Sequence, residues 1–207
     1  MLHNFNNITT FRLSKNVSRI THYTNKQYME SSTKTGIVLH IHVQRHDRKT
    51  NSPEEIVEIK NIIRYSSDFI IKNGGFISEV SDNAIIGVFD EDDIKEGTSE
   101  YKAASCANQI RKLIYEHRKN NKPYILTASI NGGRIIVGSE LGEKQHEVMG
   151  DAITASFQLI NATQPMQISL TRRVKDKLID KYSFVARLPI YFGQKKALIF
   201  YLHKSLK

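Results

Sequence analysis

The sequence predicts an α+β domain in which a mixed or antiparallel sheet carries its helices on one face. Two long stretches place apolar residues at helical spacing, and several shorter runs alternate apolar and polar residues as strands do. The pairs Asp82-Asn83 and Gly132-Gly133 separate neighbouring strand patterns and favour tight turns. A chain of 207 residues, 40% of them apolar, is long enough for one domain with a substantial core. The predicted order leaves the second face of the sheet for a ligand or another subunit.

The folded domain is predicted to span residues 36–207. Residues 1–35 are rich in Asn, Thr and Ser, and we interpret them as an N-terminal arm or a short helix. The domain opens with a strand, whose apolar face is formed by alternating residues: Ile37, Leu39, Ile41 and Val43. The polar and basic stretch 44–51 then predicts a loop.

The first helix is predicted to begin after Ser52. Ser52 is a good N-cap, Pro53 suits the first turn, and Glu55 completes a capping box. The helical pattern ends at Gly74-Gly75, as glycine often ends a helix. Strands over residues 76–80 and 84–89 then form a hairpin around Asp82-Asn83.

The rest of the chain continues the alternation of helix and strand. A second helix is predicted over residues 99–118, followed by a hairpin of 124–131 and 134–138 around Gly132-Gly133. A short helix begins near Gly150, and residues 197–202 form a closing strand.

Composition restricts the functional classes. The formal net charge of +9 permits a nucleotide, nucleic-acid or acidic-protein partner, but the basic residues are scattered and no nucleic-acid motif is present, so we do not expect nucleic acid. Cys106 is the single cysteine and excludes an intramolecular disulfide. The N-terminal stretch lacks the apolar segment of a signal peptide, and no apolar run is long enough to cross a bilayer. We therefore expect a cytoplasmic protein without a membrane anchor.

Four segments together resemble the class III adenylate and guanylate cyclase catalytic domain. Residues 74–89 resemble the metal-binding hairpin of that family, and residues 130–138 (INGGRIIVG) resemble its INTGEVVVG segment. Residues 148–153 (VMGDAI) resemble its VIGDAV helix start, and residues 193–202 resemble its closing segment. The resemblance covers about residues 36–202, and it implies a ferredoxin-like cyclase domain with helices packed on a sheet.

The resemblance also places the metal site on positions that have lost their carboxylates. In the family two aspartates hold two divalent ions, Mg²⁺ or Mn²⁺, and the corresponding positions here are His42 and Asn83. Asp82 is one residue early, and neighbouring residues tend to point in different directions. His42 and Asp82 are the remaining candidates for a metal ligand. His42 shares a strand face with His40, and such a pair can bind a transition metal, but two ligands are too few. We therefore expect no metal and no other cofactor.

The other functional positions of the family are replaced as well. Its ribose-orienting Asn falls at Thr154 and its transition-state Arg at Gln158, one helical turn later. Its base-reading pair falls at Glu79 and Glu147, and its phosphate-binding Lys falls at Gln194. No catalytic residue is therefore expected at the degenerate positions, which are His42, Asn83, Thr154 and Gln158.

One basic loop keeps a favourable place for an anion. It follows the first strand and precedes the first helix, and in the family this segment wraps the triphosphate. We expect any phosphate of a nucleotide ligand to be held there, without metal, by Gln44, Arg45, His46 and Arg48.

These residues predict a catalytically degenerate cyclase-like domain that acts as a regulatory, nucleotide-sensing or dimerisation module. We expect a homodimer, or a heterodimer with a cyclase-like chain, formed through the sheet face that carries Val38, His40 and His42. One alternative is a divergent active cyclase that makes a cyclic nucleotide with Mg²⁺ or Mn²⁺, such as a pyrimidine cyclase of the phage-defence type. A second alternative, supported only by charge, is a module that binds nucleic acid or an acidic protein.

Overall fold

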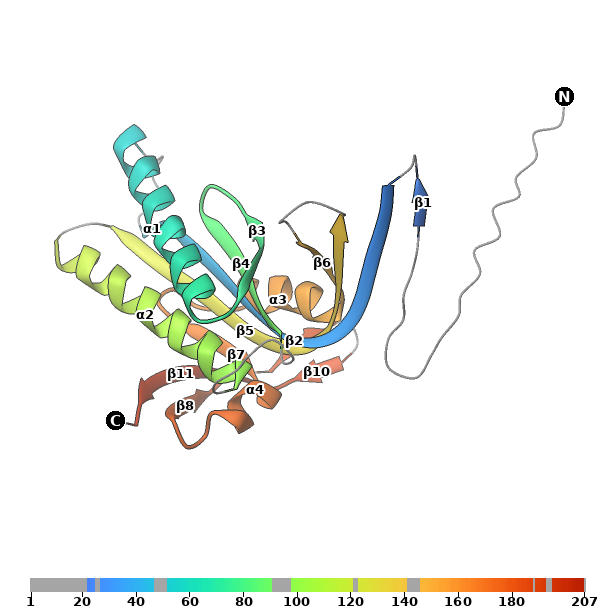
Figure 1. The fold of residues 1–207 in the computed structure, drawn as a ribbon. Coiled ribbons are helices and arrows are strands. Elements are labelled where there is room, and N and C mark those ends of the chain that lie inside the picture. The colour runs from blue at the N-terminus through green and yellow to red at the C-terminus, as the bar shows by residue number, and fades with distance from the viewer. Residues whose placement is uncertain are drawn as a thin grey trace, which may run out of the picture.

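A nine-stranded mixed sheet forms the centre of the molecule (Figure 1). The structure is a computed structural model, and it describes residues 22–24, 27–46, 52–90, 98–120, 123–140, 146–187, 189–192 and 195–206. The strand order is β3-β4-β2-β5-β7-β11-β8, with β1 beside β2 and β6 beside β5. The β5–β7 pair is parallel and the other pairs are antiparallel. The predicted α+β class is therefore confirmed. The strands of this sheet are β1 (His22–Thr24), β2 (Gln27–Arg45), β3 (Phe76–Val80), β4 (Ala84–Asp90), β5 (Tyr124–Glu140), β6 (His146–Met149), β7 (Ile168–Thr171), β8 (Tyr182–Ala186) and β11 (Ile199–Ser205).

Three helices pack on one face of this sheet, with a fourth on the other. Helices α1 (Pro53–Lys72), α2 (Ser99–Lys119) and α4 (Arg172–Lys177) enclose the larger core, and α1 and α2 lie side by side in Figure 1. The alternating residues predicted for the first strand are all fully buried in this core: Ile37, Leu39, Ile41 and Val43. Two short strands, β9 (Ile190–Phe192) and β10 (Lys195–Ala197), form a separate hairpin. None of the helices in the described part of the chain is long and apolar enough to span a membrane.

The start of α1 follows its local sequence signals. The Ser52 side chain accepts a hydrogen bond from the Glu55 backbone N–H, and the Glu55 carboxylate accepts one from the Ser52 backbone N–H at 2.8 Å. The predicted capping box is therefore confirmed. The helix ends at Lys72, and Gly74 follows with a φ of 79°, a conformation that glycine adopts easily.

The second face of the sheet is covered within the chain by α3 (Asp151–Asn161), contrary to the expectation that it is free. Val38 is fully buried there and packs in a small core with Ala152 of α3. The His40 ring is 5% exposed and meets the Phe157 ring edge-on, with 4.8 Å between ring centroids. Of the three residues expected on an open face, only His42 keeps substantial exposure.

The predicted hairpin around Gly132-Gly133 is wrong, because β5 runs straight through both glycines. Gly132 pairs with Ile37 of β2, and a Cβ atom at Gly132 would lie 2.9 Å from the Ile37 Cδ1. A Cβ atom at Gly133 would lie 3.3 Å from the Ala152 Cβ. The glycines therefore allow neighbouring elements to approach the strand closely, and they do not form a turn. The hairpin forms further along the chain, where β5 pairs with β6.

Strand β2 begins at Gln27, nine residues before the predicted start. Its first half pairs with the second half of β5, in an unbroken register that starts at Met29 and Glu140. The strand therefore crosses the predicted boundary at residue 36, and this part of the predicted N-terminal arm is extended and not helical. Residues 1–21 lie outside the described part of the chain.

Candidate functional site

The two positions expected to carry metal-binding aspartates do lie side by side. His42 is near the end of β2 and pairs with Ala84, the first residue of β4. Asn83 directly precedes β4, and its carbonyl accepts a hydrogen bond from the Val43 N–H at 2.8 Å. The Asn83 side-chain amide lies 2.7 Å from the His42 Nε2. Because the amide nitrogen can only donate, Nε2 is the acceptor and the ring proton is on Nδ1.

Both histidines of β2 are held in the neutral form. Desolvation by burial lowers the pKa of His42 below its ordinary value. Burial also lowers the pKa of His40 to about 4, and the nearby His42 contributes in the same direction. The Nδ1 atom of His40 is buried and has no hydrogen-bond partner in the described part of the chain. A proton on the Nδ1 atom of His40 would therefore have no acceptor to stabilise it.

Asp82 does not substitute for the missing carboxylates. Its side chain is 84% exposed and makes an ion pair with Lys60 of α1, with 3.1 Å between Nζ and Oδ1. Among the described residues no group of three or more His, Cys, Asp and Glu side chains is placed to hold a metal ion. Divalent Mg²⁺ prefers anionic oxygen ligands, and the neutral His42–Asn83 pair offers none. The residues described here therefore do not fit the two-ion site of the cyclase family.

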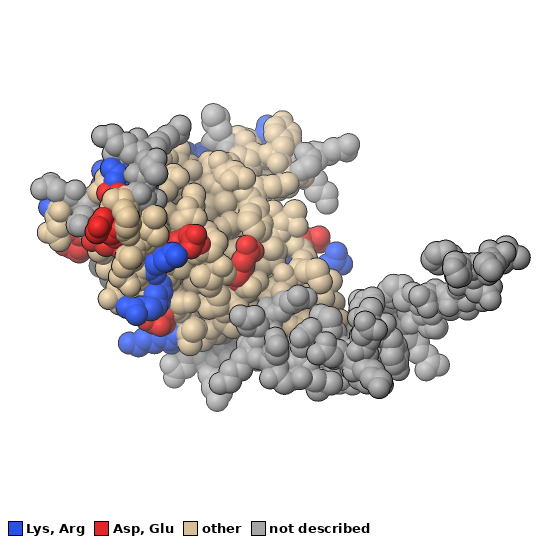
Figure 2. Space-filling view, turned by 90° about the horizontal axis from the view of Figure 1, so that it is seen from above, with Lys and Arg blue, Asp and Glu red and all other residues tan. Residues whose placement is uncertain are grey.

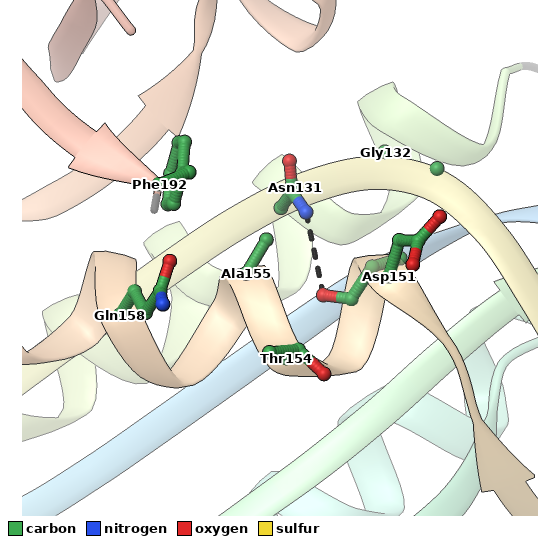
Figure 3. A pocket seen from close by; sticks show the side chains of 9 residues that line it. Asn131, Gly132, Asp151, Thr154, Ala155, Gln158 and Phe192 are labelled. Atoms are coloured by element: carbon green, nitrogen blue, oxygen red, sulfur yellow. Dashed lines mark hydrogen bonds between the residues drawn. The ribbon is translucent and has the colours of Figure 1, made fainter. Parts of the chain in front are cut away.

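The expected ribose and transition-state positions meet at a second place, a cavity of about 430 Å³ between β5 and α3. Thr154 and Gln158 both line it from α3, as their spacing predicted, and Gly132 and Gly133 line it from β5. Phe192 of β9 hangs over the helix, with Ala155 and Gln158 beneath it (Figure 3). The cavity thus presents hydroxyl and amide groups beside an aromatic ring, and neither Thr154 nor Gln158 carries a charge. The one carboxylate among its lining residues is Asp151 at the start of α3, which makes an ion pair with Arg134 at 3.1 Å.

Asn131 also lines this cavity, and it is not among the site residues predicted from the sequence. Its side-chain amide donates to the Ala152 backbone carbonyl at 3.3 Å, which leaves the Oδ1 atom on the cavity side (Figure 3). It is 6% exposed and lies in the segment that resembles the INTGEVVVG motif. One sequence signal could have indicated Asn131 as a site residue. It is a polar residue on a strand, and it directly precedes the two glycines that allow α3 to approach the sheet.

The structure describes part of the basic loop, and in that part Arg45 makes an ion pair. Gln44 is half-buried at the end of β2, His46 is exposed, and Arg48 lies outside the described residues. Arg45 makes a short ion pair with Glu55 in the first turn of α1. The guanidinium that we expect to contact a phosphate is therefore already paired with a carboxylate ten residues later.

Of the remaining expected positions, the structure describes the side chain of Glu79 only. Glu79 is exposed on β3. Glu147 lies on β6, where its backbone pairs with Gly138. Gln194 lies outside the described residues.

Comparison with known proteins identifies the fold. No protein-family profile matches the chain, and no curated protein is similar in sequence. The adenylyl cyclase CyaB from P. aeruginosa matches with a TM-score of 0.74 at 16% identity, over 85% of this chain and 97% of that one. The guanylyl cyclase Cya2 matches at 0.68 and 17% identity, over 82% and 92%. The guanylate cyclase domain of RhGC from Catenaria anguillulae matches at 0.67 and 15% identity, over 83% and 97%.

The chain has the fold of the class III cyclase catalytic domain. This confirms the fold implied by the four sequence segments. The cyclase fold also explains why residues from distant segments meet: it pairs β2 with β4 beside His42, and it sets α3 against β5 beside Gln158. Function depends on the side chains at these places and not on the fold alone.

Proposed function

We propose that this domain is a catalytically degenerate cyclase-fold module, which acts in regulation by binding a nucleotide, by dimerising, or both. The hydrogen bond between His42 and Asn83 carries the proposal. Two neutral side chains satisfy each other at the position where the resemblance expects two carboxylates. A phosphoryl-transfer enzyme of this kind needs bound divalent ions to neutralise the triphosphate.

The second half of the site supports the same proposal. Gln158 stands at the position of the transition-state arginine, and its amide carries no charge. An arginine of this type contributes about 10³–10⁵ in rate to phosphoryl transfer. A chain altered in both halves is unable to complete the site of an active partner by donating either of them.

The proposal is tested by an activity assay with all four ribonucleoside triphosphates and Mn²⁺, read for cyclic products and pyrophosphate. We expect no turnover, and we expect none from a His42→Asp, Asn83→Asp double variant, because the charge at Gln158 is still missing. Turnover that His42→Ala or Asn83→Ala abolishes would establish the alternative, a divergent active cyclase that uses Mg²⁺ or Mn²⁺.

Nucleotide binding without turnover is measured separately. The cavity beside Phe192 offers an aromatic face and neutral hydrogen-bonding groups, with the Asp151 carboxylate as the one acidic group of its lining. The guanylate cyclase domain of RhGC was solved in complex with GTP. We expect calorimetry to detect nucleotide binding that is unchanged by EDTA and weakened by Gln158→Ala. Binding that disappears with EDTA would show that a metal site exists after all.

Dimerisation is supported by apolar side chains that remain exposed near α3. Val80 on β3, Met149 on β6 and Phe157 on α3 are 55%, 59% and 42% exposed. Strand β6 contacts both β3 and α3, so the three elements that carry these side chains are neighbours. Exposed apolar groups that gather in this way are typical of association surfaces. The guanylyl cyclase domain of a Blastocladiella emersonii fusion protein has been crystallised as a dimer and as a monomer.

Light scattering at tens of micromolar tests this part of the proposal. We expect a dimer that a Met149→Ser, Phe157→Ser double variant dissociates, because the substitutions remove apolar surface from the contact. An Ile179→Ser variant is the matched control, since Ile179 is 54% exposed on the turn after α4. A strict monomer, with no cyclase-like partner captured in a pull-down, would contradict dimerisation and leave the activity test unaffected.

Charge alone does not favour a nucleic-acid partner. On the face shown in Figure 2, blue and red side chains lie close together and most of the described surface is uncharged. A nucleic-acid footprint is a stripe or patch of basic side chains.

A further inference from the structure

A second cavity lies on the opposite side of the sheet from α3, between the second half of α2 and strand β11. Its volume is about 630 Å³, within the range of small-molecule sites. None of its lining residues is acidic, and four are basic or can become so: Arg111, Lys112, His203 and Lys204. The cavity uses no residue of the site described above.

Arg111 is the fixed part of this cavity. Its side chain is almost fully buried, with 8% of the residue exposed. It donates hydrogen bonds to the Leu202 carbonyl at 2.9 Å, the His203 carbonyl at 3.2 Å and the Asn108 Oδ1 at 2.8 Å. These contacts hold the guanidinium against β11, where the pairing with β8 shifts register between Leu202 and Lys204.

All three acceptors of Arg111 are uncharged. Among the described residues Arg111 makes no ion pair, although a buried cation is costly unless an anion lies beside it. Desolvation by burial lowers the pKa of its guanidinium from the ordinary value. The burial of the Arg111 charge therefore costs free energy in the folded protein, and an anion in the cavity would reduce that cost.

The remaining charges lie where they would meet the same anion. Lys112 follows Arg111 on α2, and Lys204 follows the bulge on β11, so two elements supply ammonium groups to one space. Both lysines are exposed, and neither makes an ion pair within the described chain. Several cations around one small volume favour a ligand with more than one negative charge, because each charge adds a hydrogen bond of the stronger, charge-assisted kind.

We propose that this cavity binds a compact polyanion, a small phosphate-bearing molecule, with Arg111 as its fixed anchor and Lys112 and Lys204 as mobile contacts. The guanidinium suits the anchor because its position is already fixed by three hydrogen bonds to the protein, which leave two N–H donors for a ligand, whereas the lysines act as movable point charges. Tyr115, which is 48% exposed, adds an aromatic wall for an organic part of the ligand. The proposal is independent of whether the domain is degenerate.

Calorimetry with pyrophosphate as the probe tests it, at about 0.1 M salt so that exposed charges are screened beyond about 10 Å. We expect saturable binding that a Lys112→Ser, Lys204→Ser double variant weakens by at least about tenfold, since charge-assisted contacts are the strong ones. A Lys60→Ser, Lys72→Ser double variant on α1 is the matched control. It removes the same net charge from residues that do not line the cavity, and we expect this variant to bind pyrophosphate as the unaltered protein does.

Three results would overturn the proposal. The first is no saturable binding at several millimolar pyrophosphate. The second is an equal loss in both double variants, which would show attraction by net charge alone. The third is citrate binding at least as tightly as pyrophosphate, which would assign the cavity to carboxylates. An Arg111→Lys variant, checked for folding by its thermal transition, should lose affinity even though its charge is kept.

Discussion

Acid should destabilise this domain through His40, which is buried against Phe157. The pKa of His40 is about 4 in the folded chain, against 6.5 ordinarily. The unfolded chain therefore binds more protons than the folded chain between these values. It follows that the contribution of His40 is fully present above about pH 6.5 and is lost progressively as the pH falls to about 4.

The magnitude follows from the two pKa values. Relative to neutral pH, His40 alone should lower the free energy of unfolding by about 1.4 kcal/mol at about pH 5.5 and by about 2.5 kcal/mol at about pH 4.5. Urea unfolding across this range measures the total, to which other titrating groups also contribute. The specific measurement is the difference between the protein and a His40→Leu variant, which has no titrating group at this position.

Between neutral pH and about pH 4.5, we expect the His40→Leu variant to lose about 2 kcal/mol less of its free energy of unfolding than the unaltered protein loses. A His42→Gln variant is the matched control, because it removes the more exposed histidine of the same strand face and should retain most of the loss. If the His40→Leu variant loses as much stability as the unaltered protein at about pH 4.5, burial does not hold His40 neutral. An NMR titration that places the His40 pKa near its ordinary value would have the same meaning.

Three further substitutions test the fold by chemical unfolding. Gly150→Ala should destabilise by about 1–3 kcal/mol, because Gly150 has a φ of 127° and a Cβ atom there would lie 2.7 Å from a backbone carbonyl oxygen; an unchanged midpoint would contradict this geometry. Ser52→Ala should cost about 1 kcal/mol through loss of the cap that Glu55 shares, and a neutral result would mean that the capping box does not form. Asp82→Asn should change stability by less than about 0.5 kcal/mol, because its ion pair with Lys60 is exposed, and a larger loss would show that Asp82 has another contact.

Local rules predicted the elements whose causes are local. The alternation from Ile37 to Val43 fixed the buried face of β2, because strand side chains alternate whatever lies beyond them. The capping box at Ser52 specified the start of α1 for the same reason. By contrast, Gly132-Gly133 has two physical uses, a turn or a close approach. Only the contact with Ala152, which is remote in the sequence, distinguishes them.

The candidate site was predictable in its positions but not in its contacts. The resemblance placed His42 and Asn83 together, and the structure does so across 41 residues of chain. The hydrogen bond between the two side chains depends on their geometry, which the spacing of residues in the sequence does not determine. The ion pair of Arg45 with Glu55 was not predictable for a similar reason, because a separation of ten residues does not fix which carboxylate faces the guanidinium. The burial of His40 was missed because α3 was expected to leave that face open.

The long pairing of β2 with β5 joins the candidate site to the outer part of the sheet without a hinge. The register runs unbroken from Arg45 and Tyr124, close to His42, to Met29 and Glu140 at the far end, where β1 and β6 flank the pair. No loop therefore interrupts the strand pair between its outer end and His42. A partner that paired with the outer strands would extend the same sheet that positions the candidate site.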